Sequence, residues 1–392
     1  MTTSVRPTVV VVQEAALHAN VRALSEHVGG RPIMAVVKAN AYGHGLVPTA
    51  RTLLAAGACS LGVAFLEEGI ALRRAGIDAP ILVLGGIIGN QIHAFLEHDL
   101  AMTASSAFKV RQIDEVAEAM KRRATVHLKV DTGMGRIGVQ WDTADALFEA
   151  AERAAHVGVA GVFSHLAEAE SSDPAFTEVQ LERFLGALRW YERRGLPTPT
   201  RHLANSAGVL VHPDTWLDLV RPGIALYGVL PDSDLRSPVT LTPALSLFSR
   251  VVYFKVVREG RSVSYDRTWT AAHDTRVVTI PVGYGDGYPR RLSNRAEVVI
   301  RGRRHPVVGR VTMDAILAHL GPDGTAYNGD PVLLLGRFQD REISVAEMAR
   351  WLETIPYEVL TGINTRVPRV HLGPEQTLDP EAVYRAAVQE DG

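Results

Sequence analysis

The sequence lacks the features that mark secreted, membrane-spanning or zinc-binding proteins. Its one cysteine, Cys59, excludes an intramolecular disulfide framework and a cysteine-based zinc site. The first residues show no signal-peptide pattern, and the longest apolar run, PILVLGGIIG (80–89), is too short and too rich in glycine to cross a bilayer. Basic and acidic residues number 41 and 43 and are intermixed, so no nucleic-acid surface is expected. We therefore expect a cytoplasmic protein with no metal site and no membrane or nucleic-acid partner.

The 392 residues suit two domains, and the sequence pattern changes near residue 232. In the first part, apolar, β-branched runs alternate with amphipathic helical periodicities such as 13–28. Eight runs are typical of buried parallel strands: 33–37, 60–64, 80–84, 100–104, 125–130, 159–164, 201–204 and 220–228. Eight strand–helix units predict a (β/α)8 barrel over residues 1–232. A doubly wound open sheet is the alternative, because periodicity does not reveal closure.

The second part, residues 233–392, is predicted to be a mostly antiparallel β domain. A polar, proline-containing linker (230–240) precedes it, and alternating apolar runs follow at 248–257, 276–285, 296–302 and 330–336. One helix is expected at 344–354, where Ser344 can cap the first turn and Glu347 can complete a capping box. The predicted fold class is therefore α/β, a barrel with a C-terminal β domain.

Polar residues stand at the carboxyl ends of the predicted barrel strands, where barrel enzymes place their reactive groups. They are Lys38 at the first strand, Lys129, Asp131 and Arg136 at the fifth, His165 at the sixth, Asn205 and Ser206 at the seventh, and Arg221, Gly223 and Ile224 in the eighth. Singly, each has a structural explanation: a lone histidine is more often a core residue, and Ser206 alone is more often a helix cap. Together, on one rim, they indicate a binding site.

This set of side chains suits the binding of one kind of cofactor. A lysine in a pocket can form a Schiff base with an aldehyde. The hydroxyls of Tyr42 and Ser206, with glycine N–H groups near a helix N-terminus, can hold a phosphate. A histidine and an arginine can line a flat pocket for an aromatic ring. These are the requirements of pyridoxal 5′-phosphate (PLP).

Nine motifs in order then make the chain resemble the alanine racemase family. They are AVVKANAYGHG, KVDTGMGRIG, FSHLA, HLANSAG, VRPGIALYG, VSYDRTWTA, GYGDGYPR, VGRVTMDA and IPYEVLTGINTRVPR. The resemblance covers nearly the whole chain. It implies a PLP-dependent isomerase, a barrel with a C-terminal β domain, and a homodimer with shared active sites.

The resemblance also implies a role for each matching residue. Lys38 would hold PLP in a Schiff base and act as one catalytic base, and Tyr265 of the partner subunit would be the second. The positions matching phosphate contacts and the pocket wall are Tyr42, Ser206, Gly223, Ile224 and Tyr357, with Asn205 and Leu84 beside them. The positions matching ring and substrate contacts are Arg221 and His165 at the pyridine ring, Arg136 at the phenolic oxygen and substrate carboxylate, and Met313 and Asp314 across the dimer. Lys129 matches a lysine that is carbamylated in many members.

Racemisation of L- and D-alanine by this family needs two bases. The α-proton leaves from one face and a proton returns to the other, so Lys38 and Tyr265 would lie on opposite faces of the reacting carbon. Asp266 follows Tyr265 where the family commonly has glycine. This difference leaves the identity of the amino-acid substrate undecided. A serine or broader-specificity racemase of the same fold is the alternative. Both a cell-wall and a catabolic role for D-alanine fit the sequence.

Two further alternatives are less favoured. Related decarboxylases use a glutamate at the pyridine nitrogen and a cysteine in the β domain, whereas this chain has Arg221 there and its cysteine in the barrel. A PLP-binding protein without turnover would resemble the barrel alone. His44, in the first motif, is expected to make structural hydrogen bonds.

Overall fold

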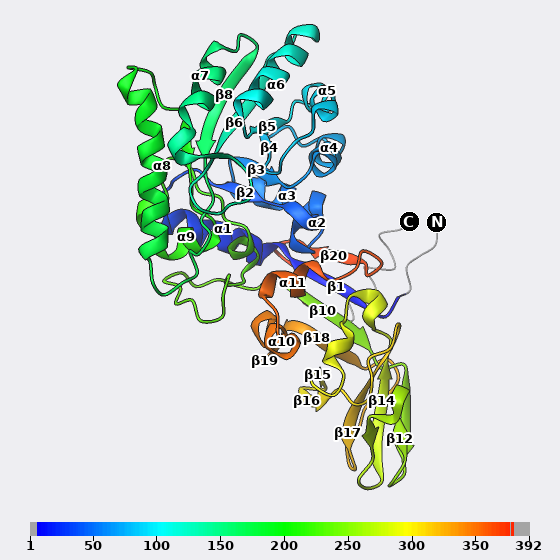
Figure 1. The fold of residues 1–392 in the computed structure, drawn as a ribbon. Helices are drawn as coiled ribbons and strands as arrows, with labels where there is room; N and C mark the ends of the chain where they lie inside the picture. Colours follow the sequence, from blue (N-terminus) through cyan, green and yellow to red (C-terminus); the bar gives the residue numbers. More distant parts are fainter. Residues whose placement is uncertain (1–5, 377, 380–392) are drawn as a thin grey trace.

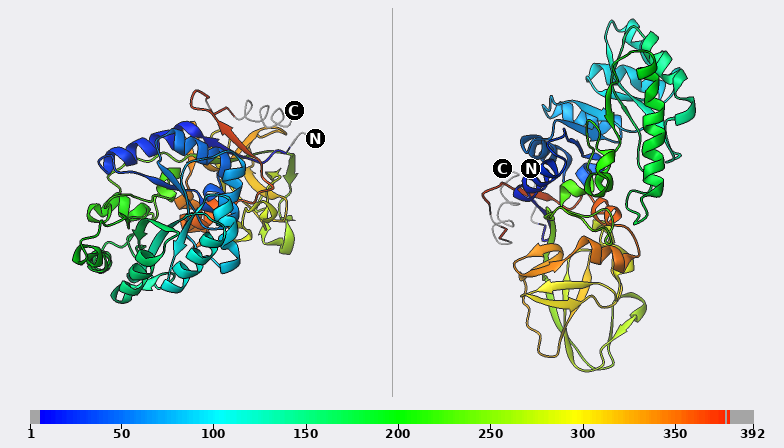
Figure 2. Two further views of the ribbon diagram at one scale, coloured as in Figure 1. Left: turned by 90° about the horizontal axis from the view of Figure 1, so that it is seen from above. Right: turned by 90° about the vertical axis from the view of Figure 1, so that its left-hand side faces the viewer.

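The first domain is a closed barrel of parallel strands (Figure 1; Figure 2, left). The computed structural model describes residues 6–376 and 378–379. Its barrel strands run in the order β2 (Met34–Val36), β3 (Ser60–Val63), β4 (Ile81–Val83), β5 (Ala101–Ala104), β6 (Ala124–Asp131), β8 (Val157–Phe163) and β9 (Thr200–His202). Residues 218–222 take the eighth place: Val220 bonds to Pro32 and Met34 on one side, and Arg221 donates to Ala204 on the other. These bonds confirm the barrel and exclude the open sheet.

The eighth segment is shorter than the pattern at 220–228 predicted. Only Val220 forms a β-bridge, with Ile33, and residues Ile224–Tyr227 form the 3-10 helix η4. Pro222 has no N–H and cannot donate to a strand ladder. The predicted strand is therefore wrong beyond residue 222, and Gly223 lies in the turn that follows it.

Helices cover the outside of the barrel (Figure 2, left). The α-helices are α1 (Glu14–His27), α3 (Leu46–Ala55), α4 (Leu66–Arg74), α5 (Ile92–Glu97), α6 (Ala107–Ala119), α7 (Asp145–Arg153), α8 (Ala175–Arg193) and α9 (Ser206–Val211); the 3-10 turns are η1 (Gly89–Gln91), η2 (Trp141–Thr143) and η3 (Pro213–Thr215), and β7 (Val139–Gln140) pairs with β6. Val110, Ile113 and Ala117 of α6 are buried, so the i, i+3, i+7 periodicity does mark the barrel-facing side.

The second domain is built mostly from antiparallel strand pairs, as predicted. Its strands are β10 (Leu245–Arg250), β11 (Tyr253–Val257), β12 (Ser262–Val263), β13 (Trp269–Thr270), β14 (Thr275–Ile280), β15 (Glu297–Ile300), β16 (Arg303–Pro306), β17 (Ile316–Gly321), β18 (Pro331–Phe338) and β19 (Arg341–Ile343), and its helical turns are η5 (Tyr265–Arg267), η6 (Tyr284–Asp286) and η7 (Arg290–Leu292). The run at 248–257, predicted as one strand, is divided between β10 and β11.

The largest sheet of this domain takes in the first described strand of the chain. β1 (Val9–Gln13), which the sequence analysis did not predict, pairs antiparallel with β10 and parallel with β20 (Arg369–Leu372). The sheet order is β16-β15-β18-β10-β1-β20. β1 runs directly into α1, so the chain connects the two domains at its start as well as near residue 232 (Figure 1).

The second domain has two helices, α10 (Val345–Leu352) and α11 (Pro356–Thr361) (Figure 1). The helix α11 contacts α2 (Lys38–Tyr42) of the barrel, and α10 packs against α11. The Ser344 hydroxyl accepts a 3.0 Å hydrogen bond from the Glu347 N–H, as the predicted cap requires. The Glu347 carboxylate binds Arg304. Within residues 6–376 and 378–379, no helix has the length and apolar character needed to span a bilayer. The ends of the predicted domains, residues 1–5 and 380–392, lie outside the described residues.

Candidate active site

Lys38 lies just past the carboxyl end of β2, at the start of a left-handed turn. The turn, α2 (Lys38–Tyr42), has φ angles of 54°, 55°, 53° and 50° at Ala39, Asn40, Ala41 and Tyr42. The motif contains glycines, yet these four positions are not glycine. A left-handed conformation costs roughly 1–2 kcal/mol for each such residue. Contacts from elsewhere must therefore hold the turn that carries Lys38 and Tyr42.

Tyr42, Ser206 and Gly223 form a small polar cradle. A Cβ built on Gly223 would lie 2.3 Å from the Tyr42 hydroxyl, so only glycine fits there. The Ser206 hydroxyl accepts hydrogen bonds from the N–H groups of Gly223 and Ala225, at 2.8 and 3.3 Å. Ser206 is not the helix cap, since the Asn205 side chain caps α9 by accepting from the Gly208 N–H.

Two more predicted residues border this cradle. The ring of Tyr357, on α11, lies 6.1 Å from the ring of Tyr42, centroid to centroid. Ile224 is fully buried at the start of η4. The second domain thus contributes one wall of a site that is otherwise built from the barrel.

Arg221 is buried and fixed by three hydrogen bonds. Its Nη2 donates to the carbonyl oxygens of Ser164 (2.7 Å) and Leu203 (3.2 Å), and its Nη1 lies 3.0 Å from Nδ1 of His202. His202 in turn bonds to His127 at 2.8 Å. Burial lowers the pKa of Arg221 to about 9. The guanidinium is held in one orientation by the barrel interior.

The mouth of the barrel is strongly basic. Burial, then Arg136, lowers the pKa of Lys38, and Glu68 opposes the shift. Lys129 is buried, with Nζ 4.2 Å from the centre of the Phe163 ring, and burial followed by Arg221 and Arg136 holds its pKa well below the usual value. The pKa of His165 is also lowered well below its usual value by burial and then by the neighbouring cations, Lys129 first. Such a site favours anions.

Arg136 and Leu84 complete the barrel side of the mouth. Arg136 is exposed on the loop after β6, and the Asp131 carboxylate holds this loop by accepting from the N–H groups of Gly133 and Gly135. Leu84 follows β4 and is half-buried. The predicted site residues of the barrel thus all lie at or follow the carboxyl ends of its strands.

Tyr265, Met313 and Asp314 are not brought to Lys38 within one chain. Their loops lie in the second domain, and β12, which precedes Tyr265, lies at the far end from α2 (Figure 1). Tyr265 is 70% exposed and Met313 53% exposed. Apolar side chains exposed to this degree are available to another molecule.

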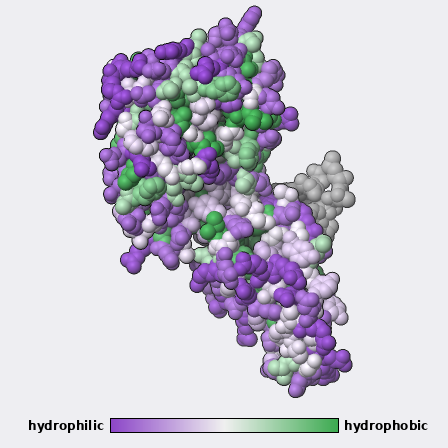
Figure 3. Space-filling view, in the orientation of Figure 1, coloured by the Kyte–Doolittle hydropathy of each residue, from purple (hydrophilic) through white to green (hydrophobic). Residues whose placement is uncertain are grey.

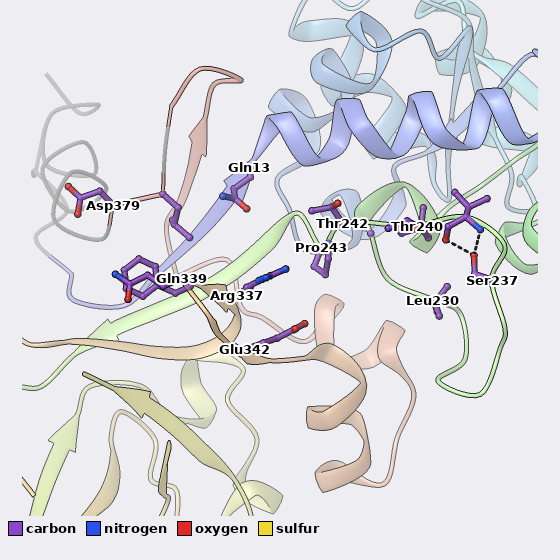
Figure 4. A pocket seen from close by; sticks show the side chains of 15 residues that line it. Gln13, Leu230, Ser237, Thr240, Thr242, Pro243, Arg337, Gln339, Glu342 and Asp379 are labelled. Carbon is purple, nitrogen blue, oxygen red and sulfur yellow. Dashed lines mark hydrogen bonds between the residues drawn. The ribbon is translucent and has the colours of Figure 1, made fainter. Parts of the chain in front are cut away.

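A cavity of about 960 Å³ lies at the junction of the two domains, apart from the predicted site (Figure 4). Its walls include Gln13, Thr242, Arg337 and Glu342. The space-filling view shows apolar and polar residues mixed over the outer face of both domains (Figure 3). None of the predicted site residues lines this cavity.

The residues at the barrel mouth fit PLP. The cradle offers two hydroxyls and glycine backbone beside a 3-10 turn, which suits a phosphate. Lys38 is one turn of chain away, with a lowered pKa that suits Schiff-base formation. Nη2 of Arg221 donates both its hydrogens to backbone carbonyls, so Nε and Nη1 carry the hydrogens that can be donated to a ring nitrogen. Phosphate, aldehyde and ring nitrogen therefore each have a matching group.

Glu68 and His202 were not predicted from the sequence. Glu68 lies in the first turn of α4, where acidic residues are common without any functional role. His202 was part of a predicted strand, but its contact with Arg221 joins residues 19 positions apart. Neither residue carried a local signal, because both act through contacts that only the closed barrel creates.

Comparisons with known proteins match the chain to one family over most of its length. Models of the alanine racemase N-terminal and C-terminal domains match residues 12–231 and 244–371. The chain is 46% identical over 368 residues to the alanine racemase of Symbiobacterium thermophilum, covering 94% of this chain and 98% of that protein. The crystal structure of the Bacillus anthracis alanine racemase with bound L-Ala-P has a TM-score of 0.89 and 38% identity, over 95% of this chain and 97% of that one. The histidine racemase of Leuconostoc mesenteroides subsp. sake has a TM-score of 0.86 and 28% identity, over 94% and 98%.

Proposed function

The chain belongs to the alanine racemase family and interconverts L- and D-alanine, and we propose that it works with PLP held at the barrel mouth. The observation that carries the proposal is the polar cradle of Tyr42, Ser206 and Gly223, one turn from Lys38. Bound there, PLP supplies an electron-withdrawing ring that stabilises negative charge at Cα of the substrate. Tyr357, Ile224, Asn205 and Leu84 complete the walls.

Lys38 and Tyr265 are the proposed bases. Burial and Arg136 lower the pKa of the Lys38 amine, which raises the fraction of uncharged amine that can take the proton from Cα. Tyr265 would act on the opposite face, from the partner subunit. Two groups on opposite faces let one remove the proton while the other returns it, which inverts the carbon.

The proposed pairing requires a homodimer, and the exposure of the loops that carry Tyr265 and Met313 supports one. Tyr265 and Met313 are exposed on loops of the second domain, and β12, which precedes Tyr265, lies at the far end from α2 (Figure 1). Phe65, Ile88 and Phe108 are also exposed, and they follow the neighbouring strands β3, β4 and β5 at the barrel mouth. We propose that the second domain of one subunit covers the barrel mouth of the other, with Met313 and Asp314 contacting its substrate.

Arg221 and Arg136 have separate proposed roles. Arg221 would donate a hydrogen bond to the pyridine nitrogen and keep it unprotonated, and His165 would lie behind Arg221. An unprotonated ring withdraws electrons less strongly, which limits side reactions. Arg136 would bind the substrate carboxylate, since a guanidinium matches a carboxylate with two donors. Lys129 would carry a carbamate that pairs with Arg136.

The fold admits other amino acids, since a histidine racemase shares it at a TM-score of 0.86. Alanine is nevertheless the substrate named for the closer relatives. Racemisation of L-alanine, L-serine and L-histidine measured side by side tests this, and we expect L-alanine to have the highest kcat/KM. We further propose a cytoplasmic enzyme, a boundary near residue 232 between its domains, and a role in supplying D-alanine for the cell wall.

Mixing two inactive variants tests the shared site. Lys38→Ala and Tyr265→Phe should each lose almost all turnover. After subunit exchange, half of the dimers are mixed, and each mixed dimer has one site with both bases, so about a quarter of the wild-type activity should return. No recovery after exchange, with mixed dimers demonstrated by mass, would overturn the proposed pairing. Visible absorbance lost in Lys38→Ala but kept in Tyr265→Phe would support the covalent role of Lys38.

A further inference from the structure

The left-handed turn at Ala39–Tyr42 is tied at its start by Glu68. The Ala39 N–H donates to Oε1 of Glu68 at 2.6 Å. The other oxygen, Oε2, accepts from the N–H groups of Ala64 and Phe65, at 2.8 and 3.2 Å. One half-buried carboxylate therefore links the turn after β2 to the turn after β3.

The far end of the same turn is tied by His44. This side chain is fully buried, and its Nδ1 lies 3.1 and 3.0 Å from the carbonyl oxygens of Ala41 and Tyr42. Both partners are acceptors, so Nδ1 must carry the hydrogen. The His44 carbonyl also accepts from the side chain of His371 on β20. His44 therefore makes structural hydrogen bonds, as expected, at the Tyr42 end of the turn. Glu68 binds the other end, next to Lys38.

A glutamate suits the position beside Ala39 better than its neutral analogue. Two segments donate to two different oxygens, and a glutamine has only one acceptor oxygen, with its NH2 turned toward the other N–H groups. The Glu68 carboxylate also faces Lys38, and its negative charge opposes the effect of Arg136, from the loop after β6, on the pKa of Lys38. His165, after β8, also lies near enough to interact with Lys38. Glu68 thus combines a bridge between two turns with a negative charge near the amine.

We propose that Glu68 is a positioning residue for Lys38: its carboxylate locks the left-handed turn, so that Lys38 and Tyr42 are presented together to the cofactor. The proposal rests on the proposed function, in which Lys38 binds PLP. Without the bridge, the strained turn relaxes, and the amine and the phosphate cradle lose their common alignment. The same change removes the negative charge that favours a protonated nitrogen at position 38.

Glu68→Gln tests the proposal, with Glu67→Gln as a matched control. Glu67 lies next to it on α4 and is exposed. We measure the Kd of the apoenzyme for PLP and the pH at which the visible absorbance of the holoenzyme changes. For Glu68→Gln we expect PLP affinity about tenfold weaker, the scale of a lost hydrogen bond to a charged group, and an absorbance change moved to lower pH. Glu67→Gln should match wild type in both.

Glu68→Asp separates the effect of side-chain length from the effect of charge. The shorter side chain cannot bridge both turns but keeps the charge, so PLP affinity should fall while the pH midpoint stays close to wild type. If Glu68→Gln does not fold, this variant alone tests the affinity. Wild-type affinity and pH midpoint in folded Glu68→Gln overturn the proposal, provided that Lys38→Ala abolishes the visible absorbance. Unchanged absorbance in Lys38→Ala would instead overturn the proposed function.

Discussion

Arg366 donates a 2.7 Å hydrogen bond from Nη2 to the Asp314 carboxylate, while its Nε binds Asp286 at 2.6 Å. Asp286 is almost fully buried and also accepts from the Gly283 N–H. A Cβ on Gly285 would lie 2.6 Å from the guanidinium, so the glycine allows this close approach. The GYGDGYPR motif therefore holds Asp314, a proposed substrate contact, through Arg366.

We predict that Arg366→Lys raises the KM for L-alanine several-fold with a smaller change in kcat. A lysine keeps the charge but cannot bond to two carboxylates through one planar fork. Asp314 would then lose its fixed position, while Lys38 and the cradle stay intact. Steady-state kinetics in both directions provide the measurement.

Arg303→Lys is the control for this prediction. Arg303 is an exposed residue of β16 at the edge of the large sheet. Its replacement should leave KM and kcat unchanged. An unchanged KM in Arg366→Lys, with visible absorbance equal to wild type, would show that Asp314 does not depend on Arg366.

Asp266 is neutralised by two arginines other than its neighbour in sequence. Its carboxylate lies 3.1 Å from Nε of Arg310 and 3.5 Å from Nη2 of Arg290. Its φ is 58°, which explains why glycine suits this position. Two cations therefore flank the residue that follows Tyr265.

We predict that Asp266→Asn lowers kcat several-fold, because Arg290 and Arg310 lose the carboxylate that fixes the turn carrying Tyr265. Asparagine tolerates the left-handed conformation, so the variant removes the ion pairs with little backbone strain. Steady-state kinetics with L-alanine provide the measurement, and the visible absorbance should stay at the wild-type level. An unchanged kcat would show that this carboxylate has no influence on Tyr265.

The barrel was predictable because buried parallel strands leave a strong pattern of β-branched residues, as in β6 and β8. β1 was not, although VVVV is apolar, because its partners β10 and β20 lie more than 200 residues away. Pro222 could have indicated that the eighth strand ends early. Closure itself depends on backbone bonds from Val220 to Pro32 and Met34 and from Arg221 to Ala204, which no periodicity records.

The residues of the site were identified by motif, but the contacts that hold them were not. Lys38, Tyr42 and Ser206 carry chemistry that a sequence displays. The left-handed backbone of Ala39 occurs at a residue that is not glycine, so the motif does not reveal it. Glu68 acts on it from the next βα unit, and such support appears only when the chain is folded.

Lys129 is predicted to carry a carbamate. Burial and then Arg221 and Arg136 hold its pKa well below the usual value, which favours the uncharged amine, the form that attacks CO2 and releases a proton. The product is an anion that both arginines stabilise. After equilibration with 13C-bicarbonate, the wild type should show a carbamate carbon signal that Lys129→Met lacks. The signal should persist when the exposed Lys121 is replaced by methionine. A wild-type spectrum without it would contradict the modification.

His127 should make the fold sensitive to acid. Burial, and then Arg221, lowers the pKa of His127 from 6.5 to about 4. Between these values the unfolded chain binds a proton that the folded protein does not. The free energy of unfolding therefore falls with decreasing pH, by up to about 1.4 kcal/mol per pH unit for this group. Above pH 6.5 the histidine is neutral in both states, and the contribution is fully present.

His127→Gln removes this titration, and its amide can keep a hydrogen bond to His202. We expect its free energy of unfolding to fall less steeply than that of the wild type between pH 6.5 and 4. Urea unfolding at several pH values, at one protein concentration and with saturating PLP, gives both slopes. His44, His165 and His202 remain in both proteins, so the difference between the slopes belongs to His127. Equal slopes would mean that His127 is protonated in the folded barrel as readily as in the unfolded chain.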